Sequence, residues 1–170
     1  MPWKFNYHCD GWVIFGLQLD PQPLCGKRPY MNQLAVLAPV FVLIAMTFGL
    51  LYWQARARIA ALRSKQTAMR DIALGQANWP PRATQINRAF QNQFELPVLF
   101  YVLVALVLAT GRQSTLFLVI EWLFVAARLV HAYVHTTTNF VLHRFRAYAA
   151  GMAILGAGWL WFAFVVARGG

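Results

Sequence analysis

Residues 34–53 read LAVLAPVFVLIAMTFGLLYW and contain no charged side chain. A helix that crosses the roughly 30 Å hydrocarbon core of a bilayer needs about 20 mainly apolar residues, because each residue advances it by about 1.5 Å. No alternation of apolar and polar residues favours a strand instead. The stretch therefore predicts a transmembrane helix.

Three further stretches have the same character: Phe94–Ala109, Leu116–Val134 and Tyr148–Ala167. The chain has 170 residues, of which 59% are hydrophobic and 12% charged, whereas a soluble domain carries about 25% charged residues. Soluble, disordered and disulfide-stapled secreted classes are excluded on this composition. Helices satisfy their own backbone hydrogen bonds in lipid. The sequence predicts an all-α membrane protein, a bundle of four transmembrane helices.

The formal net charge of +10 raises the question of nucleic-acid binding, but the basic residues gather in two links between spans. The first link runs from about Gln54 to Asn87 and holds Arg56, Arg58, Arg63, Lys65, Arg70 and Arg82. The short link after the third span holds His143, Arg144 and Arg146. Basic loops lie on the cytoplasmic side of membranes. We therefore expect both termini on the non-cytoplasmic side, and no nucleic-acid partner, since no basic face is interleaved with stacking aromatics.

The chain is expected to divide at its first span. Residues 1–30 carry both cysteines and no metal or signal motif, and we expect an extra segment that is disordered or precedes the natural start at Met31. Residues 31–170 form the four-helix domain. Gln54–Leu74 is rich in helix formers and predicts an extension of the first helix that ends at Gly75. Residues 78–81, NWPP, predict a turn.

Ionisable residues inside a span are costly and indicate function by default. Arg88, Asn92 and Glu95 are spaced i, i+4, i+7 and share one face at the start of the second span. Pro97 removes one helical hydrogen bond and predicts a kink just beyond Glu95.

A second polar stripe runs along the third span at Glu121, Arg128, His131 and His135. The two stripes are expected to face each other around a pocket open to the cytoplasm, where arginine would bind carboxylates. A structural ion pair of Arg128 with Glu95 or Glu121 remains the alternative. The two histidines have no third ligand at suitable spacing, so we expect no metal.

Small residues of the last span, Gly151, Gly156 and Gly158, indicate close helix packing.

The segment Arg88-Ala89-(x2)-Asn92-(x2)-Glu95 with Pro97, which opens a second span after a basic loop, resembles the MAPEG family, membrane-associated proteins in eicosanoid and glutathione metabolism. Ala127-Arg128-Leu129 fits the same family pattern, and the resemblance covers about residues 34–167.

The resemblance implies a homotrimer that binds glutathione as co-substrate between subunits near the cytoplasmic side. Arg88 would hold a glutathione carboxylate, Asn92 and Glu95 would contact its polar backbone, and Arg128 would orient the pocket. His131 would stand in the same pocket. A thiol-activating arginine of the synthases would correspond to Arg144, with Arg146 as the alternative. A hydrophobic small-molecule acceptor would arrive from membrane lipid.

The chain departs from the eicosanoid enzymes, which have tyrosines where Leu96, His131 and His135 stand here. The expected function is a glutathione-dependent transferase or peroxidase acting on membrane-soluble electrophiles. A non-catalytic lipid- or ligand-binding or scaffolding protein of the same fold is the alternative, and a small transport component is a third. The expected location is the plasma or inner membrane of a bacterium, or the endoplasmic reticulum of a eukaryote.

Overall fold

The computed structural model describes residues 13–14, 17–18, 33–73 and 78–169. The chain divides into two compact units, Met1–Tyr30 and Met31–Gly170. In the first unit, β1 (Val13–Ile14) pairs with β2 (Leu17–Gln18) in antiparallel register. The expectations for Met31, both cysteines, Gly75 and most of residues 1–30 lie outside the described residues.

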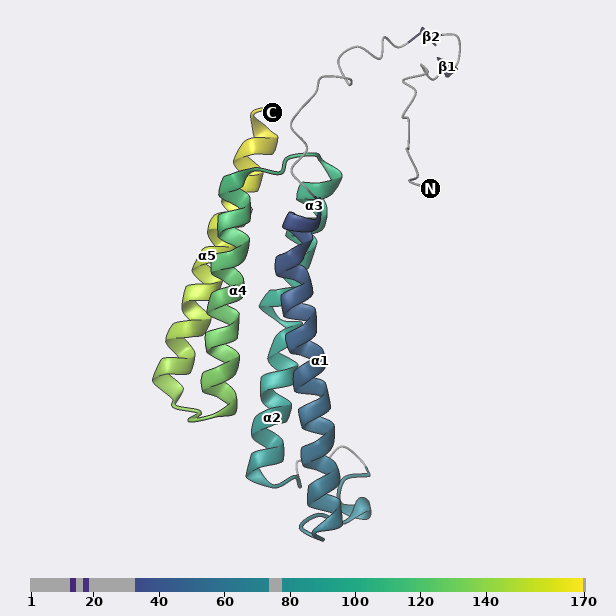
Figure 1. Ribbon diagram of the computed structural model, residues 1–170, viewed down its shortest axis with the longest axis vertical. Helices are drawn as coiled ribbons and strands as arrows, with labels where there is room; N and C mark the ends of the chain where they lie inside the picture. Colours follow the sequence, from purple (N-terminus) through teal and green to yellow (C-terminus); the bar gives the residue numbers. More distant parts are fainter. Residues whose placement is uncertain (1–12, 15–16, 19–32, 74–77, 170) are drawn as a thin grey trace, which may run out of the picture. The chain divides into compact units, whose positions relative to one another are not determined.

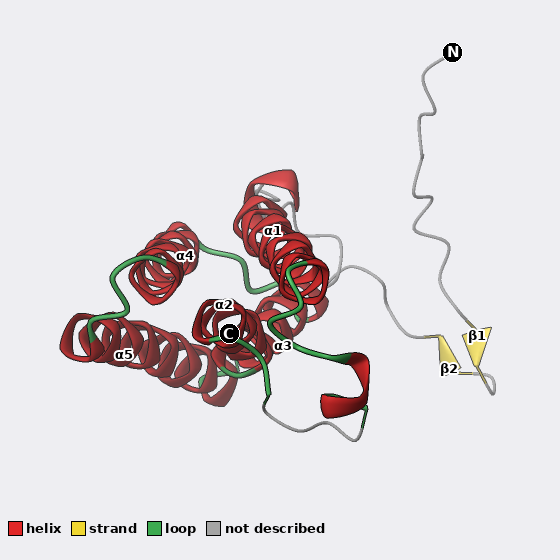
Figure 2. Cartoon of the chain, turned by 90° about the horizontal axis from the view of Figure 1, so that it is seen from below, coloured by secondary structure: helices red, strands yellow, loops and turns green. Residues whose placement is uncertain are grey.

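The second unit is a helical bundle (Figures 1 and 2). Its helices are α1 (Gln33–Arg63), α2 (Pro81–Gln91), α3 (Leu96–Ala109), α4 (Thr115–Thr136) and α5 (Val141–Ala167), with the short 3-10 helices η2 (Met69–Asp71) and η3 (Asn92–Phe94). Four stretches are long and apolar enough to cross a membrane: α1, the pair α2–α3, α4 and α5. The prediction of an all-α bundle of four transmembrane helices is confirmed.

The first helix ends earlier than the sequence predicts, at Arg63 instead of near Gly75. Lys65 adopts a left-handed conformation with φ 55°. The Lys65 amide donates to Leu62 O at 3.1 Å and the Gln66 amide to Ala61 O at 3.0 Å. This pair of bonds satisfies the last carbonyls of the helix and reverses the chain, so good helix formers beyond it do not extend α1.

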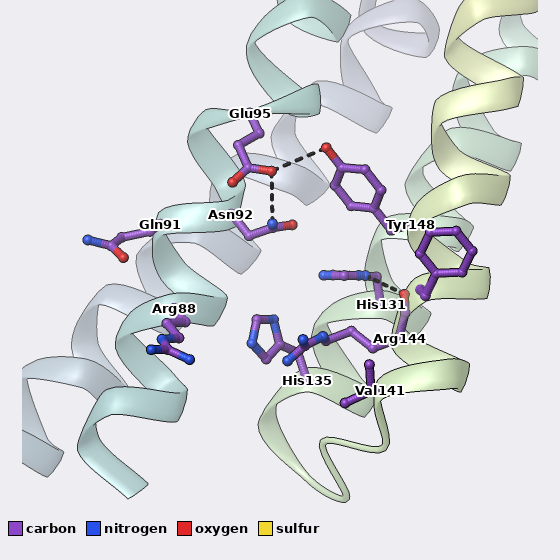
Figure 3. Close-up of a pocket in the computed structure, with 10 residues that line it drawn as sticks. Arg88, Gln91, Asn92, Glu95, His131, His135, Val141, Arg144 and Tyr148 are labelled. Carbon is purple, nitrogen blue, oxygen red and sulfur yellow. Dashed lines mark hydrogen bonds between the residues drawn. The ribbon is translucent and has the colours of Figure 1, made fainter. Parts of the chain in front are cut away.

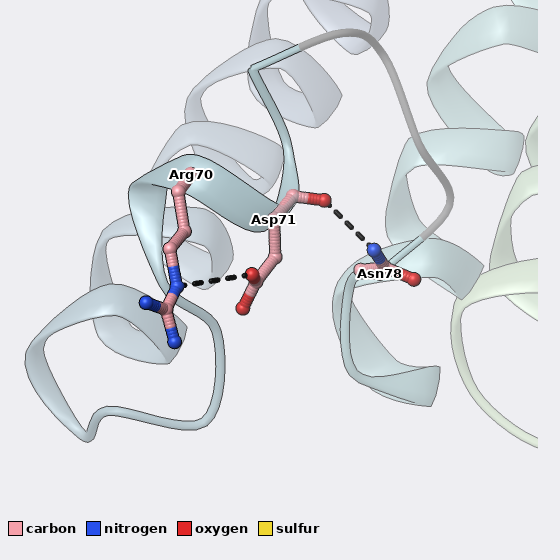
Figure 4. A network of polar contacts seen from close by, with 3 residues as sticks. All are labelled: Arg70, Asp71 and Asn78. Carbon is pink, nitrogen blue, oxygen red and sulfur yellow. Dashed lines mark hydrogen bonds and ion pairs between the residues drawn. The ribbon is translucent and has the colours of Figure 1, made fainter.

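Figure 4 shows polar contacts among Arg70, Asp71 and Asn78 in the loop after α1. Arg70 Nε lies 3.5 Å from Asp71 Oδ1, and Asn78 Nδ2 donates to Asp71 O at 2.8 Å. Both side chains of the ion pair are exposed, so the pair contributes little to stability.

The last helix begins seven residues before the predicted Tyr148, at Val141. No glycine or proline interrupts 141–148, so nothing stops the helix from starting directly after the turn. His143, Arg144 and Arg146 therefore lie on the first turns of α5 instead of in a link.

The apolar core occupies one half of the bundle, formed by the start of α1, by α3, by the first half of α4 and by the second half of α5. Phe100 stacks on Phe124 with ring centroids 4.7 Å apart, and Phe117 stacks on Trp161 at 5.3 Å. A Cβ at Gly158 would meet Leu103 Cδ2 at 3.1 Å, so this glycine allows the close packing predicted for it.

Gly151 is also buried, whereas Gly156 is exposed with open space around it, so the packing prediction is wrong for Gly156.

Arginines at both ends of the bundle bind the final carbonyls of neighbouring helices. Arg82 Nη1 donates to Thr136 O at 2.6 Å, and Gln85 Nε2 donates to His135 O at 2.8 Å. At the opposite end Arg112 Nη1 donates to Val165 O at 2.9 Å. A cation at a helix C-terminus is favourable because it faces the negative end of the helix dipole.

Candidate active site at a break in the second span

The second span is interrupted in its middle. After α2 the chain continues as η3, and Glu95 leaves the helical region with φ −100° and ψ −104° before α3 begins at Leu96. Pro97 lies in the first turn of α3, where its missing amide costs no internal hydrogen bond. The predicted kink is therefore a full break in the helix. The break lies at Glu95 and in the turn before Glu95, and not beyond Glu95 as predicted.

Arg128 of α4 fills this break. Its Nη2 donates to Asn92 O at 3.0 Å and to Asn92 Oδ1 at 2.7 Å. The residue is 0% exposed. The break frees backbone carbonyls that α2 no longer uses, and a guanidinium can reach both a backbone and a side-chain oxygen at once.

A hydrogen-bonded chain continues from Asn92 to the cleft surface (Figure 3). Asn92 Nδ2 donates to Glu95 Oε2 at 3.0 Å, and the Tyr148 hydroxyl donates to the same oxygen at 3.2 Å. Because Arg128 occupies Asn92 Oδ1, the Asn92 amide is held in one orientation. Glu95 Oε1 makes no hydrogen bond with the described part of the chain, so it can accept one from a ligand.

The break borders a cleft of about 400 Å³, which we call the first lobe. Its lining comes from α2, η3, α4 and α5, together with Glu95. The lining residues are Arg88, Gln91, Asn92, Glu95, His131, His135, Val141, Arg144, Phe145 and Tyr148. The structure thus brings the predicted Arg88, Asn92, Glu95, His131 and Arg144 together. Arg128 lies behind the lining, and Arg146 is exposed on α5 outside it.

Two guanidiniums face the first lobe. Arg88 is exposed and its side chain makes no hydrogen bond or ion pair within the described part of the chain. Arg144 donates from Nη1 to Asn139 Oδ1 at 2.6 Å, and its other side-chain donors have no partner among the residues that the structure describes. With Glu95 as the one carboxylate in the lining, the lobe suits a ligand that carries anionic groups and one ammonium.

The two histidines are buried and differ in their contacts. His131 Nδ1 donates to Arg144 O at 3.1 Å, which fixes the first turn of α5 against α4. His131 Nε2 and His135 Nδ1 are buried and have no hydrogen-bond partner within the described ranges. The rings meet edge to face with centroids 5.5 Å apart. Among the described residues, no group of three or more His, Cys, Asp or Glu side chains could hold a metal ion.

Neither ion pair considered for Arg128 forms. Within the described ranges the only ion pair is Arg70 with Asp71. Arg128 binds two oxygens of Asn92 through Nη2, and its buried Nε and Nη1 have no hydrogen-bond partner among the described residues. Glu121 is 0% exposed, and both of its carboxylate oxygens lack a hydrogen-bond partner. The i+7 spacing placed Glu121 and Arg128 on one face, but the two residues lie two turns apart along α4.

Sequence reasoning missed several lining residues, chiefly Tyr148, Gln91 and Phe145. Tyr148 stands four residues after Arg144, so both share a face of α5. The sequence predicts a helix that starts at Tyr148, so Arg144 falls in a link and its i, i+4 relation to Tyr148 is not recognised.

Comparison with known proteins assigns the fold. The sequence profile of the MAPEG family matches residues 36–164, which is most of the chain. The chain belongs to the MAPEG family. A search of curated proteins and a search of solved structures each returned no match. As a MAPEG protein with four apolar spans, the chain is an integral membrane protein. The family is one of glutathione and eicosanoid metabolism.

Proposed function

We propose that this chain is a membrane glutathione-dependent transferase or peroxidase, with glutathione bound in the first lobe. The observation that carries the proposal is the charge pattern of that lobe: Arg88 and Arg144 face it together with Glu95. Glutathione carries two carboxylates, one ammonium and one thiol. Such a ligand needs cationic donors and one carboxylate acceptor in the same cleft.

Arg88 is the natural partner of a glutathione carboxylate, because its guanidinium has no partner within the described residues. Glu95 is the partner of the ammonium through its free Oε1, and the hydrogen bonds from Asn92 and Tyr148 hold the carboxylate in place. His131 contributes by fixing the first turn of α5, which carries Arg144.

Arg144 is proposed to stabilise the thiolate of glutathione. A cation beside a thiol favours the deprotonated, nucleophilic form. The sulfur then attacks the electrophilic carbon, the C–S bond forms as the leaving group departs with the bonding pair, and the thiol proton passes to water. A hydrophobic acceptor reaches the lobe from the lipid along the exposed apolar side chains of Val141 and Phe145.

The assembly and orientation follow the same proposal. We infer a homotrimer whose subunits meet near the lobe, and a cytoplasmic position for the bundle end that carries Arg63, His143 and Arg146. Basic residues at that end obey the positive-inside rule, and glutathione would enter from the cytoplasm.

Arg144→Ala and Arg146→Ala form a matched pair that tests catalysis. The two arginines are separated in the chain by Phe145 alone, and only Arg144 lines the lobe. We expect Arg144→Ala to lower turnover of an apolar electrophile such as a chlorodinitrobenzene by at least about 100-fold, because the thiolate loses its cation. Glutathione binding, read by thermal shift, should change much less, and Arg146→Ala should behave as the unchanged protein.

Equal turnover in both variants would contradict the assignment of Arg144. Glutathione binding without any turnover in the unchanged protein, across a panel of electrophiles and hydroperoxides, would favour the non-catalytic ligand-binding reading of the same fold.

A further inference from the structure

Two exposed aromatic side chains end the apolar stretch of α1, and an arginine lies beside each of them. Tyr52 is 65% exposed and Trp53 is 40% exposed. The Arg56 guanidinium lies 5.9 Å from the centroid of the Tyr52 ring, and the Arg82 guanidinium of α2 lies 5.1 Å from the centroid of the Trp53 ring. We call these four residues the aromatic–arginine belt. None of them lines the first lobe.

The belt lies at the depth of the phospholipid headgroups. Exposed Tyr and Trp side chains mark the membrane–water interface, and the charge-free stretch 34–53 ends at Trp53. Arg56 follows about 4.5 Å further along the helix axis, which is within a headgroup layer of about 5–7 Å.

The Arg56 side chain also leans back toward the bilayer. Side chains of a helix point toward its N-terminus, and the N-terminal part of α1 is its apolar span. Arg56 Nη1 donates to the Tyr52 hydroxyl, one turn back, at 3.3 Å. The guanidinium is therefore nearer to the hydrocarbon core than its own backbone is.

Both belt arginines are exposed and retain donors. Arg56 uses Nη1 for its bond to Tyr52. Arg82 uses Nη1 for its bonds to Thr136 O and Gln85 Oε1. The Nε and Nη2 groups of both arginines make no hydrogen bond within the described part of the chain. Each guanidinium can therefore still donate to an external acceptor.

No acidic residue neutralises the belt. Asp71 is the only acidic residue between Gln33 and Phe94, and it lies against Arg70. The belt therefore carries two positive charges that are not paired with a carboxylate among the described residues, and such a surface attracts a partner of net negative charge.

We propose that the aromatic–arginine belt binds the headgroup phosphates of anionic phospholipids in the leaflet around this end of the bundle. Arg56 and Arg82 donate to the phosphate oxygens, for which the guanidinium fork is well suited. The aromatic rings hold the two guanidiniums at headgroup depth. A zwitterionic phospholipid carries an ammonium beside its phosphate and has no net charge, so the belt attracts it less. The proposal holds whether or not the first lobe binds glutathione.

The test measures lipid binding to the full chain by native mass spectrometry, in an uncharged detergent at low ionic strength and without glutathione. Phosphatidylglycerol and phosphatidylcholine with the same acyl chains compete in equimolar amounts. One arginine near the membrane surface changes the affinity for an anionic lipid by about fivefold. With two belt arginines, we expect the chain to prefer phosphatidylglycerol by at least about tenfold.

Arg56→Gln and Arg63→Gln form the matched variants. Both arginines are exposed on α1, and their i, i+7 spacing places them on one face. Arg63 lies about 15 Å beyond Trp53 along the axis, outside the headgroup layer. Arg56→Gln should reduce the preference for phosphatidylglycerol by about fivefold, and Arg63→Gln should keep most of it. Arg56→Lys, which retains the charge, should also keep most of it.

Three results would overturn the proposal. The first is no preference between the two lipids in the unchanged chain. The second is an equal loss in Arg56→Gln and Arg63→Gln, which would assign the preference to net charge. The third is lipid binding by monomers and not by oligomers in the same spectra, which would show that a second copy covers the belt. Because no glutathione is present, none of these results depends on the proposed function.

Discussion

Asn92 is the residue on which the site geometry depends. It accepts from Arg128 at 2.7 Å and donates to Glu95 at 3.0 Å. A buried arginine on one helix therefore determines where a carboxylate on the cleft surface points. The i, i+4 spacing of Arg88 and Asn92 is consistent with one helical face, but the i, i+7 spacing to Glu95 crosses the break and is not carried by a continuous helix. The sequence predicted a polar face at Asn92 from spacing alone. It could not show which helix supplies its partner, because that depends on tertiary packing.

Asn92→Asp tests this arrangement. The aspartate still accepts from Arg128, but it loses the donor to Glu95 and places a second negative charge beside it. We expect glutathione affinity to fall at least about tenfold, which corresponds to roughly 1.4 kcal/mol and to the loss of one charged hydrogen bond. Equilibrium titration with glutathione measures the change.

Gln91→Glu is the control for Asn92→Asp. It makes the same amide-to-carboxylate change at the neighbouring position, which lines the same lobe and makes no hydrogen bond to Glu95 in the structure. Affinities that fall equally in both variants would show that added charge, and not the Asn92 hydrogen bonds, controls binding.

Helix ends are where the elements differ most from the sequence prediction. The helical interiors of α1, α3, α4 and α5 follow from apolar length alone. The end of α1 depends on two backbone hydrogen bonds around Lys65, and lysine carries no sequence signal for a left-handed residue. The break before α3 was signalled by Pro97, but its position was fixed by Arg128, which binds the carbonyl that the break exposes.

Lys65→Gly tests the account of the α1 end. Glycine adopts positive φ without the Cβ conflict that lysine has, so the substitution should stabilise the bundle by about 0.5–1 kcal/mol in denaturant unfolding. Lys65→Ala removes the same charge but keeps the Cβ, and it should give no such gain. Equal effects from both changes would assign the result to charge instead of backbone conformation.

At the scale of the whole molecule, the bundle has two halves, one with an apolar core and one with a polar cleft. One half is packed with aromatic and aliphatic side chains, including the Phe100–Phe124 stack. The other carries the break, the first lobe and the two arginines that line this lobe, Arg88 and Arg144. Composition and hydropathy predicted the fold because every span must be long and apolar enough to cross the hydrocarbon core of the membrane. The same rule says nothing about how polar residues meet inside the bundle, so the network through Arg128, Asn92 and Glu95 was visible only in the structure.

The most direct test of the central claim is the binding of glutathione to the purified chain, read as a thermal shift over a concentration series. Arg88→Ala is compared with Arg63→Ala, which changes an exposed arginine outside the first lobe. The account predicts saturable stabilisation in the unchanged protein and in Arg63→Ala, and its loss in Arg88→Ala. No shift at millimolar glutathione, or an equal shift in both variants, would contradict it.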